Sequence, residues 1–127
     1  MSLSPALAQF TRQSYLNLES FRKTGEGVKT PVWFIEHEGS FYITTEEQSF
    51  KVKRIRRNPQ VRVVPSDMRG TPKGDWADAT AEIVTDPAVE TQVKALFKRK
   101  YGLMVWIFDR MARGTPTRVV VKLSLTD

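Results

Sequence analysis

The sequence predicts one small domain of mainly β structure, an antiparallel barrel with flanking helices of the α+β class, spanning residues 1–127. Its 127 residues suit one hydrophobic core and are few for a two-domain enzyme. Segments rich in β-branched, aromatic or alternating apolar residues recur along the chain, and turn-forming residues separate them. The expected order is a helix, three strands, a helix, two strands, two helices and a strand, without the βαβ alternation of a parallel sheet.

The composition is that of a folded protein with excess positive charge. Hydrophobic residues make up 40% of the chain and charged residues 27%, which argues against disorder. The 20 Lys and Arg against 14 Asp and Glu give a net charge of +6, so some surface should attract phosphates, nucleic acid or acidic headgroups. Cysteine is absent, which excludes disulfides and thiol nucleophiles and favours the cytoplasm. Neither a secretion signal nor a membrane span is expected.

The N-terminal part is expected to hold a short helix and two hairpins. Ser4 and Pro5 suit an N-cap and a first helical position. Alternating apolar residues predict a strand over 15–21, followed by a turn. Strands are also predicted over 28–35 and 41–44, joined by a turn that includes the single histidine, His37.

Pro31 lies inside the strand predicted over residues 28–35. Because proline has no N–H to donate to a ladder, this strand is expected at a sheet edge, at a bulge, or facing a partner other than a strand. A flat ligand is one such partner.

A basic helix is expected after the second hairpin. Thr45 and Gln48 form a capping-box pattern, and the helix should end before Pro59. Within it, Phe50 and Ile55 are expected to face the core while most of the cations face water.

This helix carries five cationic side chains within seven residues, from Lys51 to Arg57. The hydroxyls of Thr45 and Ser49 and the ammonium group of Lys51 lie near its expected start, where unpaired N–H groups and the helix dipole favour an anion. The pattern predicts a phosphate-binding site. From the charge run alone, a solvated helix face is an equal alternative.

The second half of the chain continues with strands and helices. A long polar loop over 65–74 is of the kind that often carries function. The expected elements are strands over 61–64, 76–84 and 118–125, a helix from Pro87 to Tyr101, and a short helix over 103–111.

The order of several motifs resembles that of the flavin-binding split-barrel family, which includes the pyridoxamine 5′-phosphate oxidases and their deazaflavin-dependent relatives. The resemblance extends from about Tyr15 to Leu125 and implies a split β-barrel of the FMN-binding type. The motifs that carry it are Thr30-Pro31-Val32-Trp33-Phe34, the run from Phe41 to Lys51, Arg56-Arg57-Asn58-Pro59-Gln60-Val61, Ser66-Asp67-Met68-Arg69-Gly70 and Lys100-Tyr101-Gly102.

This resemblance implies a cofactor, coenzyme F-420 or FMN, bound at a homodimer interface, and hydride or electron transfer to or from a small organic substrate. The ring would lie along Lys29–Trp33, with hydrogen bonds from backbone N–H groups near Thr30–Val32. The implied contacts are Lys29, Thr45, Ser49 and Lys51 for the phosphate; Thr30, Pro31, Val32 and Trp33 for the ring; Lys53 and Arg54 for a second phosphate or an anionic tail; and Ser66, Asp67, Arg69 and Trp76, contributed by the other subunit.

Two departures from the family pattern bear on the substrate and the cofactor. Phe50 stands where pyridoxamine phosphate oxidases usually carry a cation, and the additional cations of the basic helix favour the polyanionic deazaflavin. The chain ends at Asp127 without the tryptophan- and arginine-bearing segment that reads the pyridoxal substrate, so oxidation of vitamin B6 is not expected.

Other interpretations remain open at this stage. Trp33 and Trp76 can be ordinary half-buried strand residues, and Asp67 and Arg69 can simply pair with each other or cap a turn. No nucleophile–base pair or metal site is evident, which suits either cofactor-based chemistry or a non-catalytic, sensory flavin-binding protein. A nucleic-acid-binding module is the least favoured alternative, because the aromatic spacing fits a core better than a stacking platform.

Overall fold

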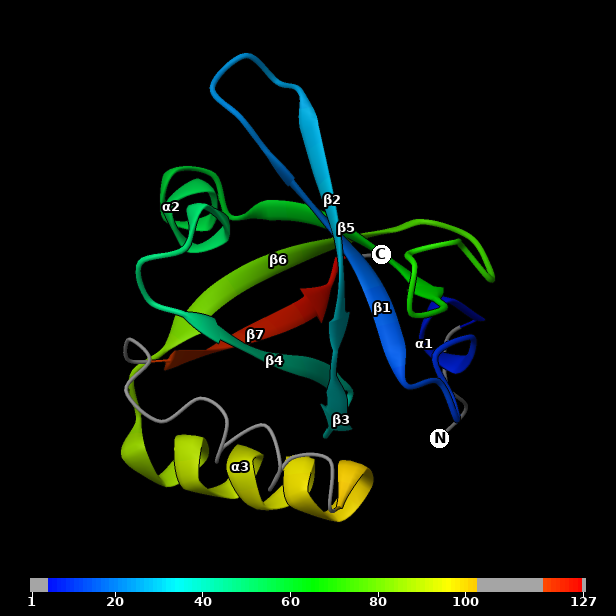
Figure 1. Cartoon of the computed structure of the whole chain (residues 1–127), viewed down its shortest axis with the longest axis vertical. Helices are drawn as coiled ribbons and strands as arrows, with labels where there is room; N and C mark the ends of the chain where they lie inside the picture. The colour runs from blue at the N-terminus through cyan, green and yellow to red at the C-terminus, as the bar shows by residue number, and fades with distance from the viewer. Residues whose placement is uncertain (1–4, 103–117, 127) are drawn as a thin grey trace.

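The structure is a computed structural model that describes residues 5–102 and 118–126. The chain forms an antiparallel sheet that is flanked by helices (Figure 1). Its elements are α1 (Pro5–Ala8), β1 (Tyr15–Phe21), β2 (Gly27–Trp33), β3 (Ile35–His37), β4 (Ser40–Glu46), α2 (Phe50–Arg57), β5 (Gln60–Ser66), β6 (Ala77–Val84), α3 (Pro87–Tyr101) and β7 (Arg118–Leu125).

The seven strands follow the order β2-β1-β5-β6-β7-β4-β3, and every neighbouring pair is antiparallel. The two edge strands, β2 and β3, are consecutive in the chain and are separated only by Phe34. The chain therefore passes from one edge of the sheet to the other at this residue, which closes the sheet into a barrel. The predicted split barrel is confirmed, but the single strand expected over 28–35 is two strands.

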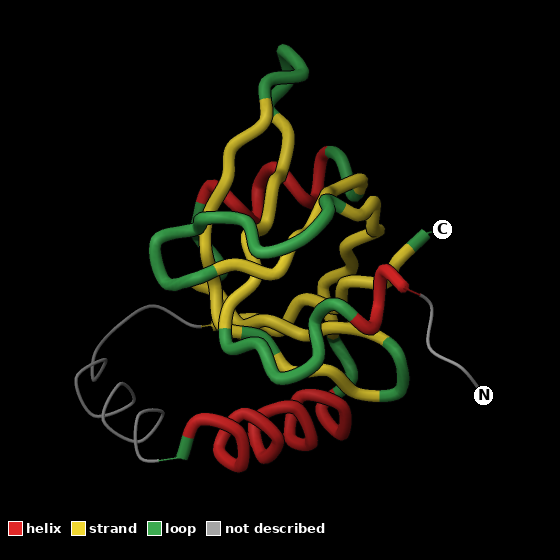
Figure 2. Tube along the Cα trace, turned by 90° about the vertical axis from the view of Figure 1, so that its right-hand side faces the viewer, coloured by secondary structure: helices red, strands yellow, loops and turns green. Residues whose placement is uncertain are grey.

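Apolar side chains fill the inside of the barrel, and the helices cover its two ends. Leu16, Leu18, Val63, Ile43 and Leu123, all fully buried, belong to this main core. A second cluster joins α3 to β3, β4 and β7. The two views place α2 and α3 at opposite ends of the barrel (Figures 1 and 2).

The start and the phase of the basic helix differ from the prediction. Thr45 pairs with Val119 inside the β4–β7 ladder, so its backbone is extended and cannot cap a helix. The N-cap is Ser49, whose Oγ accepts a hydrogen bond from the Val52 N–H at 3.3 Å. Because α2 begins after Ser49, Val52 faces the core with Ile55, whereas Phe50 is 75% exposed. The helix ends before Pro59, as predicted.

Strand β2 tolerates Pro31 because of its position at the sheet edge. The Arg22 N–H donates to the Glu26 carbonyl oxygen at 2.9 Å, which fixes the alternation of bonded pairs along the hairpin. By this alternation the backbone groups of Lys29, Pro31 and Trp33 face away from β1. The missing N–H of Pro31 therefore costs the sheet no hydrogen bond, and the predicted edge position is confirmed.

The later elements agree with the sequence pattern. Asp86 caps α3 by accepting a hydrogen bond from the Ala88 N–H, and Gly102 follows the helix with a φ of 56°. Ala79 and Ala81 lie on the packed face of β6. The short helix expected over 103–111 lies outside the described residues. Among those residues, no helix is long and apolar enough to cross a membrane.

Candidate cofactor-binding site

Two hydroxyl groups meet where β4 leads into α2. The Oγ1 of Thr45 lies 3.4 Å from the Oγ of Ser49, and the Ser49 N–H donates to the Glu46 carbonyl oxygen at 3.0 Å. Thr45 is 6% exposed, so the sheet holds one hydroxyl in place while the helix N-terminus holds the other. Hydroxyls and helical N–H groups are a donor set that suits a phosphate oxygen.

Lys51, in the first turn of α2, lies within electrostatic range of two further cations, Arg54 and Arg118. Lys51 is half-buried, and Arg118, at the start of β7, donates to the carbonyl oxygen of Thr44 at 2.9 Å. Burial lowers the pKa of Lys51, and the charges of Arg54 and Arg118 lower this pKa further, although Glu46 opposes them. The positive charges therefore repel one another more than the nearby carboxylate attracts them, and a bound anion would relieve this repulsion.

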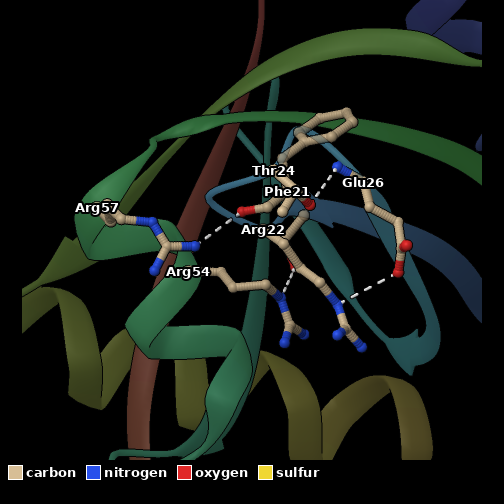
Figure 3. A network of polar contacts seen from close by, with 7 residues as sticks. Phe21, Arg22, Thr24, Glu26, Arg54 and Arg57 are labelled. Carbon is tan, nitrogen blue, oxygen red and sulfur yellow. Dashed lines mark hydrogen bonds and ion pairs between the residues drawn. The ribbon is translucent and has the colours of Figure 1, made fainter.

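Arg54 is anchored to the first hairpin beside α2. Its Nε donates to the Oγ of Ser20 at 2.7 Å, and the neighbouring Arg57 donates to the Phe21 carbonyl oxygen at 3.3 Å. Arg22 pairs with Glu26 across the hairpin turn at 3.5 Å (Figure 3). Burial lowers the pKa of Arg54, and the charges of Arg22 and Arg57 lower it further. Three guanidinium groups are thus held close together between the hairpin and α2.

The charge run of α2 therefore divides into two sets. Lys51 and Arg54 are half-buried; Lys51 follows the hydroxyl pair by two residues, and Arg54 is bonded to Ser20 of the first hairpin. Lys53, Arg56 and Arg57 are exposed, and the ammonium group of Lys53 lies 5.4 Å from the centre of the Phe50 ring. The solvated-face interpretation fits the exposed set only.

The strand expected to hold the ring, Lys29–Trp33, is β2, but its side chains point in different directions. Val32 packs against the main core, whereas Trp33 stacks on Tyr101 with ring centroids 4.5 Å apart. The bonding alternation directs the N–H groups of Thr30 and Val32 toward β1 rather than toward a ligand. Contacts from this strand would therefore come from the backbone of Lys29, Pro31 and Trp33, at the open edge.

Lys29 and Trp76 lie together in one chain. The Lys29 ammonium group is 5.3 Å from the centroid of the Trp76 ring, and the Arg62 guanidinium carbon is 5.1 Å from it. Arg62 also pairs with the buried Glu19 at 3.3 Å. The described contacts of Lys29 do not include Thr45 or Ser49, so this chain does not bring Lys29 into the hydroxyl cluster.

The loop after β5 is held by internal hydrogen bonds and lies against β2 of its own chain. Asp67 Oδ1 accepts hydrogen bonds from the N–H groups of Arg69 and Thr71 at 2.8 and 2.9 Å, which confirms the turn-capping interpretation for Asp67. These bonds, with that from Thr71 first, lower the pKa of Asp67. The Arg69 side chain is exposed, and the hydroxyl of the buried Ser66 donates to the Asp67 carbonyl oxygen.

Asn17 fastens this loop to the sheet. Its Nδ2 donates to the Gly70 carbonyl oxygen at 2.8 Å, and its ladder partner on β2 is Pro31. The Oδ1 of Asn17 is buried and has no hydrogen-bond partner among the described residues. The loop thus reaches the middle of β2 of its own chain.

The sequence alone does not predict Arg118, Ser20 or Asn17 as residues near the candidate site. Each is brought there by pairing or packing between segments far apart in the chain, and none belongs to a local motif. The described residues contain no group of three or more His, Cys, Asp or Glu side chains that could hold a metal ion.

Comparison with known proteins identifies the family. The model of the pyridoxamine 5′-phosphate oxidase family matches residues 3–127, nearly the whole chain. The chain belongs to this family. The split barrel and the motif order expected from the resemblance agree with this membership. No curated protein matches the sequence.

Solved structures show the same fold as this member of the pyridoxamine 5′-phosphate oxidase family. HutZ, a heme storage protein from Vibrio cholerae, has a TM-score of 0.73 and 17% identity, covering 100% of this chain and 92% of its own. A FAD-binding protein from Mesorhizobium loti has a TM-score of 0.69 and 16% identity. The match covers 100% of this chain and 91% of that protein. An F420 reductase has a TM-score of 0.61 and 20% identity. The match covers 99% of this chain and 97% of that protein. At these identities the similarity establishes a shared fold.

Proposed function

We propose that this protein is an oxidoreductase that binds coenzyme F-420 or FMN at a homodimer interface and acts on a small organic substrate. The observation that carries the proposal is the pair of hydroxyls of Thr45 and Ser49 at the start of α2, followed by the half-buried Lys51, on which the charges of Arg54 and Arg118 act. Family membership, and the flavin-type and deazaflavin-type names of structural relatives, support the same conclusion. The lack of cysteine suits a cytoplasmic protein.

The donor set fits a phosphorylated cofactor. Hydroxyls and helical N–H groups can donate to phosphate oxygens, and the cations can offset the phosphate charge. A second phosphate or an anionic tail would extend toward Arg54 and Lys53, where the positive charge continues along α2. This continuation favours F-420 over FMN, whose single phosphate needs only Thr45, Ser49 and Lys51.

The chain's part in the reaction would be to bind and orient. The cofactor, when bound, supplies the hydride or electron transfer. The Thr45 and Ser49 hydroxyls and the Lys51 ammonium group would hold the phosphate, and the open edge of β2 would lie beside the ring. A second subunit would complete the site, because β2 is the edge strand of the sheet. No catalytic side chain is assigned, and the Phe50 position argues against a true pyridoxamine phosphate oxidase.

A reoxidation assay separates this function from a non-catalytic one. Reduced FMN and reduced F-420 are each mixed with an organic acceptor, such as a quinone, with and without the protein. Oxidation of one cofactor that is faster with protein supports the proposal. Tight binding without acceleration across a panel of acceptors would instead support a sensory or storage role. Binding of duplex DNA that falls steeply with salt, with no cofactor binding, would support the nucleic-acid alternative.

A further inference from the structure

The end of α3 makes a set of polar contacts at the break between β2 and β3. The Phe34 N–H donates to the Tyr101 hydroxyl at 2.9 Å, and that hydroxyl lies 2.6 Å from the Phe34 carbonyl oxygen. It also lies 2.7 Å from the carbonyl oxygen of Ser14, just before β1. Having one proton, the hydroxyl donates to one of the two carbonyls at a time.

These contacts replace the ladder at the residue where the sheet divides. Phe34 belongs to neither strand, and its side chain is buried at 1% exposure, so its backbone groups need partners from elsewhere. The Tyr101 hydroxyl accepts a hydrogen bond from the Phe34 N–H and lies within donating distance of the Phe34 carbonyl oxygen. Lys100 adds a second donor, because its ammonium group lies 2.8 Å from the same carbonyl oxygen. The path of the chain from β2 into β3 is therefore fixed by two consecutive residues of α3.

The ring of Tyr101 holds the neighbouring residue of β2. It stacks on Trp33 with an interplanar angle of 12° and a centroid distance of 4.5 Å, and it stacks on Phe97 at 5.6 Å. Trp33 is the last residue of the strand along which the ring of the cofactor would lie. Tyr101 thus contacts both the side chain of Trp33, by stacking, and the backbone of Phe34, by hydrogen bonds.

We propose that Tyr101 is a positioning residue that holds the end of β2 in the position in which this strand binds a flat heterocyclic ring. This inference rests on the proposed function, because it concerns the same strand. Tyr101 acts through Trp33 and Phe34, and it lies outside the phosphate cluster of Thr45, Ser49 and Lys51. Its loss should therefore weaken the binding of a ligand with a ring and leave the binding of a bare phosphate unchanged.

The test compares Tyr101→Phe with the wild type and with Tyr42→Phe. Tyr101→Phe keeps the stacked ring but removes the hydroxyl that serves Phe34. Tyr42→Phe removes a hydroxyl from the same apolar cluster and leaves the bonds of Tyr101 and Lys100 to Phe34 in place. For each protein, affinity for FMN and for F-420 is measured by fluorescence. Affinity for inorganic phosphate is measured by NMR shifts of the Ser49 and Lys51 amides. Thermal unfolding shows whether each variant is folded. Hydrogen exchange of the Phe34 amide measures directly how well the Phe34 N–H is protected by its bond to the Tyr101 hydroxyl.

We expect Tyr101→Phe to weaken binding of the ring cofactor about tenfold, as loss of hydrogen bonds at one site would do. Phosphate affinity should not change, and the Phe34 amide should exchange faster. Tyr42→Phe should match the wild type in all three. If Tyr101→Phe bound the ring cofactor as tightly as wild type, or lost affinity for cofactor and for phosphate equally, the role of Tyr101 would be refuted. Either result would leave the proposed function standing. Failure of the wild type to bind either cofactor would overturn the proposed function and this inference with it.

Discussion

The Nε of Arg54 donates a hydrogen bond of 2.7 Å to the Oγ of Ser20, which ties α2 to the first hairpin. Ser20 is fully buried, whereas the rest of the Arg54 guanidinium group remains within electrostatic range of Arg22, Arg57 and Lys51. The bond therefore holds a positive charge in place against repulsion from its neighbours. It also fixes the position of one of the two cations whose charges act on Lys51.

Ser20→Ala should destabilise the protein and weaken anion binding together. Removing the acceptor should lower the free energy of unfolding by about 1–2 kcal/mol, since Arg54 can still reach water. Urea denaturation measures this change. Ser124→Ala is a suitable control, because within residues 5–102 and 118–126 its hydroxyl makes only a long contact, with Ser40 at 3.5 Å. If Ser20→Ala were no less stable than Ser124→Ala, the tether would have no energetic role.

Gly70→Ala should cost more stability than Gly39→Ala. Both glycines have left-handed backbone, with φ of 89° and 82°, so both variants lose about 1 kcal/mol from the backbone alone. At Gly70 an added Cβ would also lie 3.0 Å from Asn17 Nδ2, whereas at Gly39 it would meet nothing within 4 Å. The additional loss at Gly70, about 1 kcal/mol, is the strain on the Asn17 contact. Equal losses in denaturant titrations would mean that Asn17 moves aside freely.

Stability should rise with pH above about pH 8 because of Lys100. Burial lowers the pKa of Lys100 from 10.5 to about 8, against the opposing charge of Glu36. Between these two values the unfolded chain binds a proton that the folded chain has released, so raising the pH favours the folded state. Burial also raises the pKa of Tyr101, which lowers stability only above about pH 10, where the unfolded tyrosine ionises.

The pH effect is measured as the free energy of unfolding from about pH 7.5 to 9.5, below the range in which tyrosine ionises. Lys100→Met should reduce the slope, while Lys98→Met, which removes another ammonium group of the same helix, should keep it, because of these two lysines only Lys100 is bonded to the Phe34 carbonyl oxygen. The same slope in wild type and Lys100→Met would show that the ammonium group at Phe34 titrates as it does in water.

The sequence pattern was sufficient to predict the fold because local signals agree with it. Period-two alternation marks the strands, Pro31 marks an edge, and Asp86, Pro87 and Gly102 mark the ends of α3. The start of α2 was predicted wrongly, because Thr45 suits a helix cap locally but is drawn into a ladder with Val119. That pairing is non-local and outweighs the local preference.

The candidate site was only partly accessible to sequence reasoning. Thr45, Ser49 and Lys51 are close in the chain, and the structure keeps them close. Arg118 joins them because β7 pairs with β4, and Lys29 lies instead beside Trp76 across the strands β1 and β5. These contacts depend on strand order, which no single motif in the chain specifies.

The most direct test of the central claim is a parallel titration of cofactor-free protein with FMN and with F-420. Wild type, Lys51→Ala and Lys53→Ala are compared by fluorescence, since Lys51 lies in the hydroxyl and cation cluster and Lys53 is exposed on the same helix. We expect wild type to bind one cofactor with a dissociation constant on the order of micromolar, Lys51→Ala to bind it about tenfold more weakly, and Lys53→Ala to lose far less. Binding of neither cofactor, or equal losses in the two variants, would contradict the proposed site.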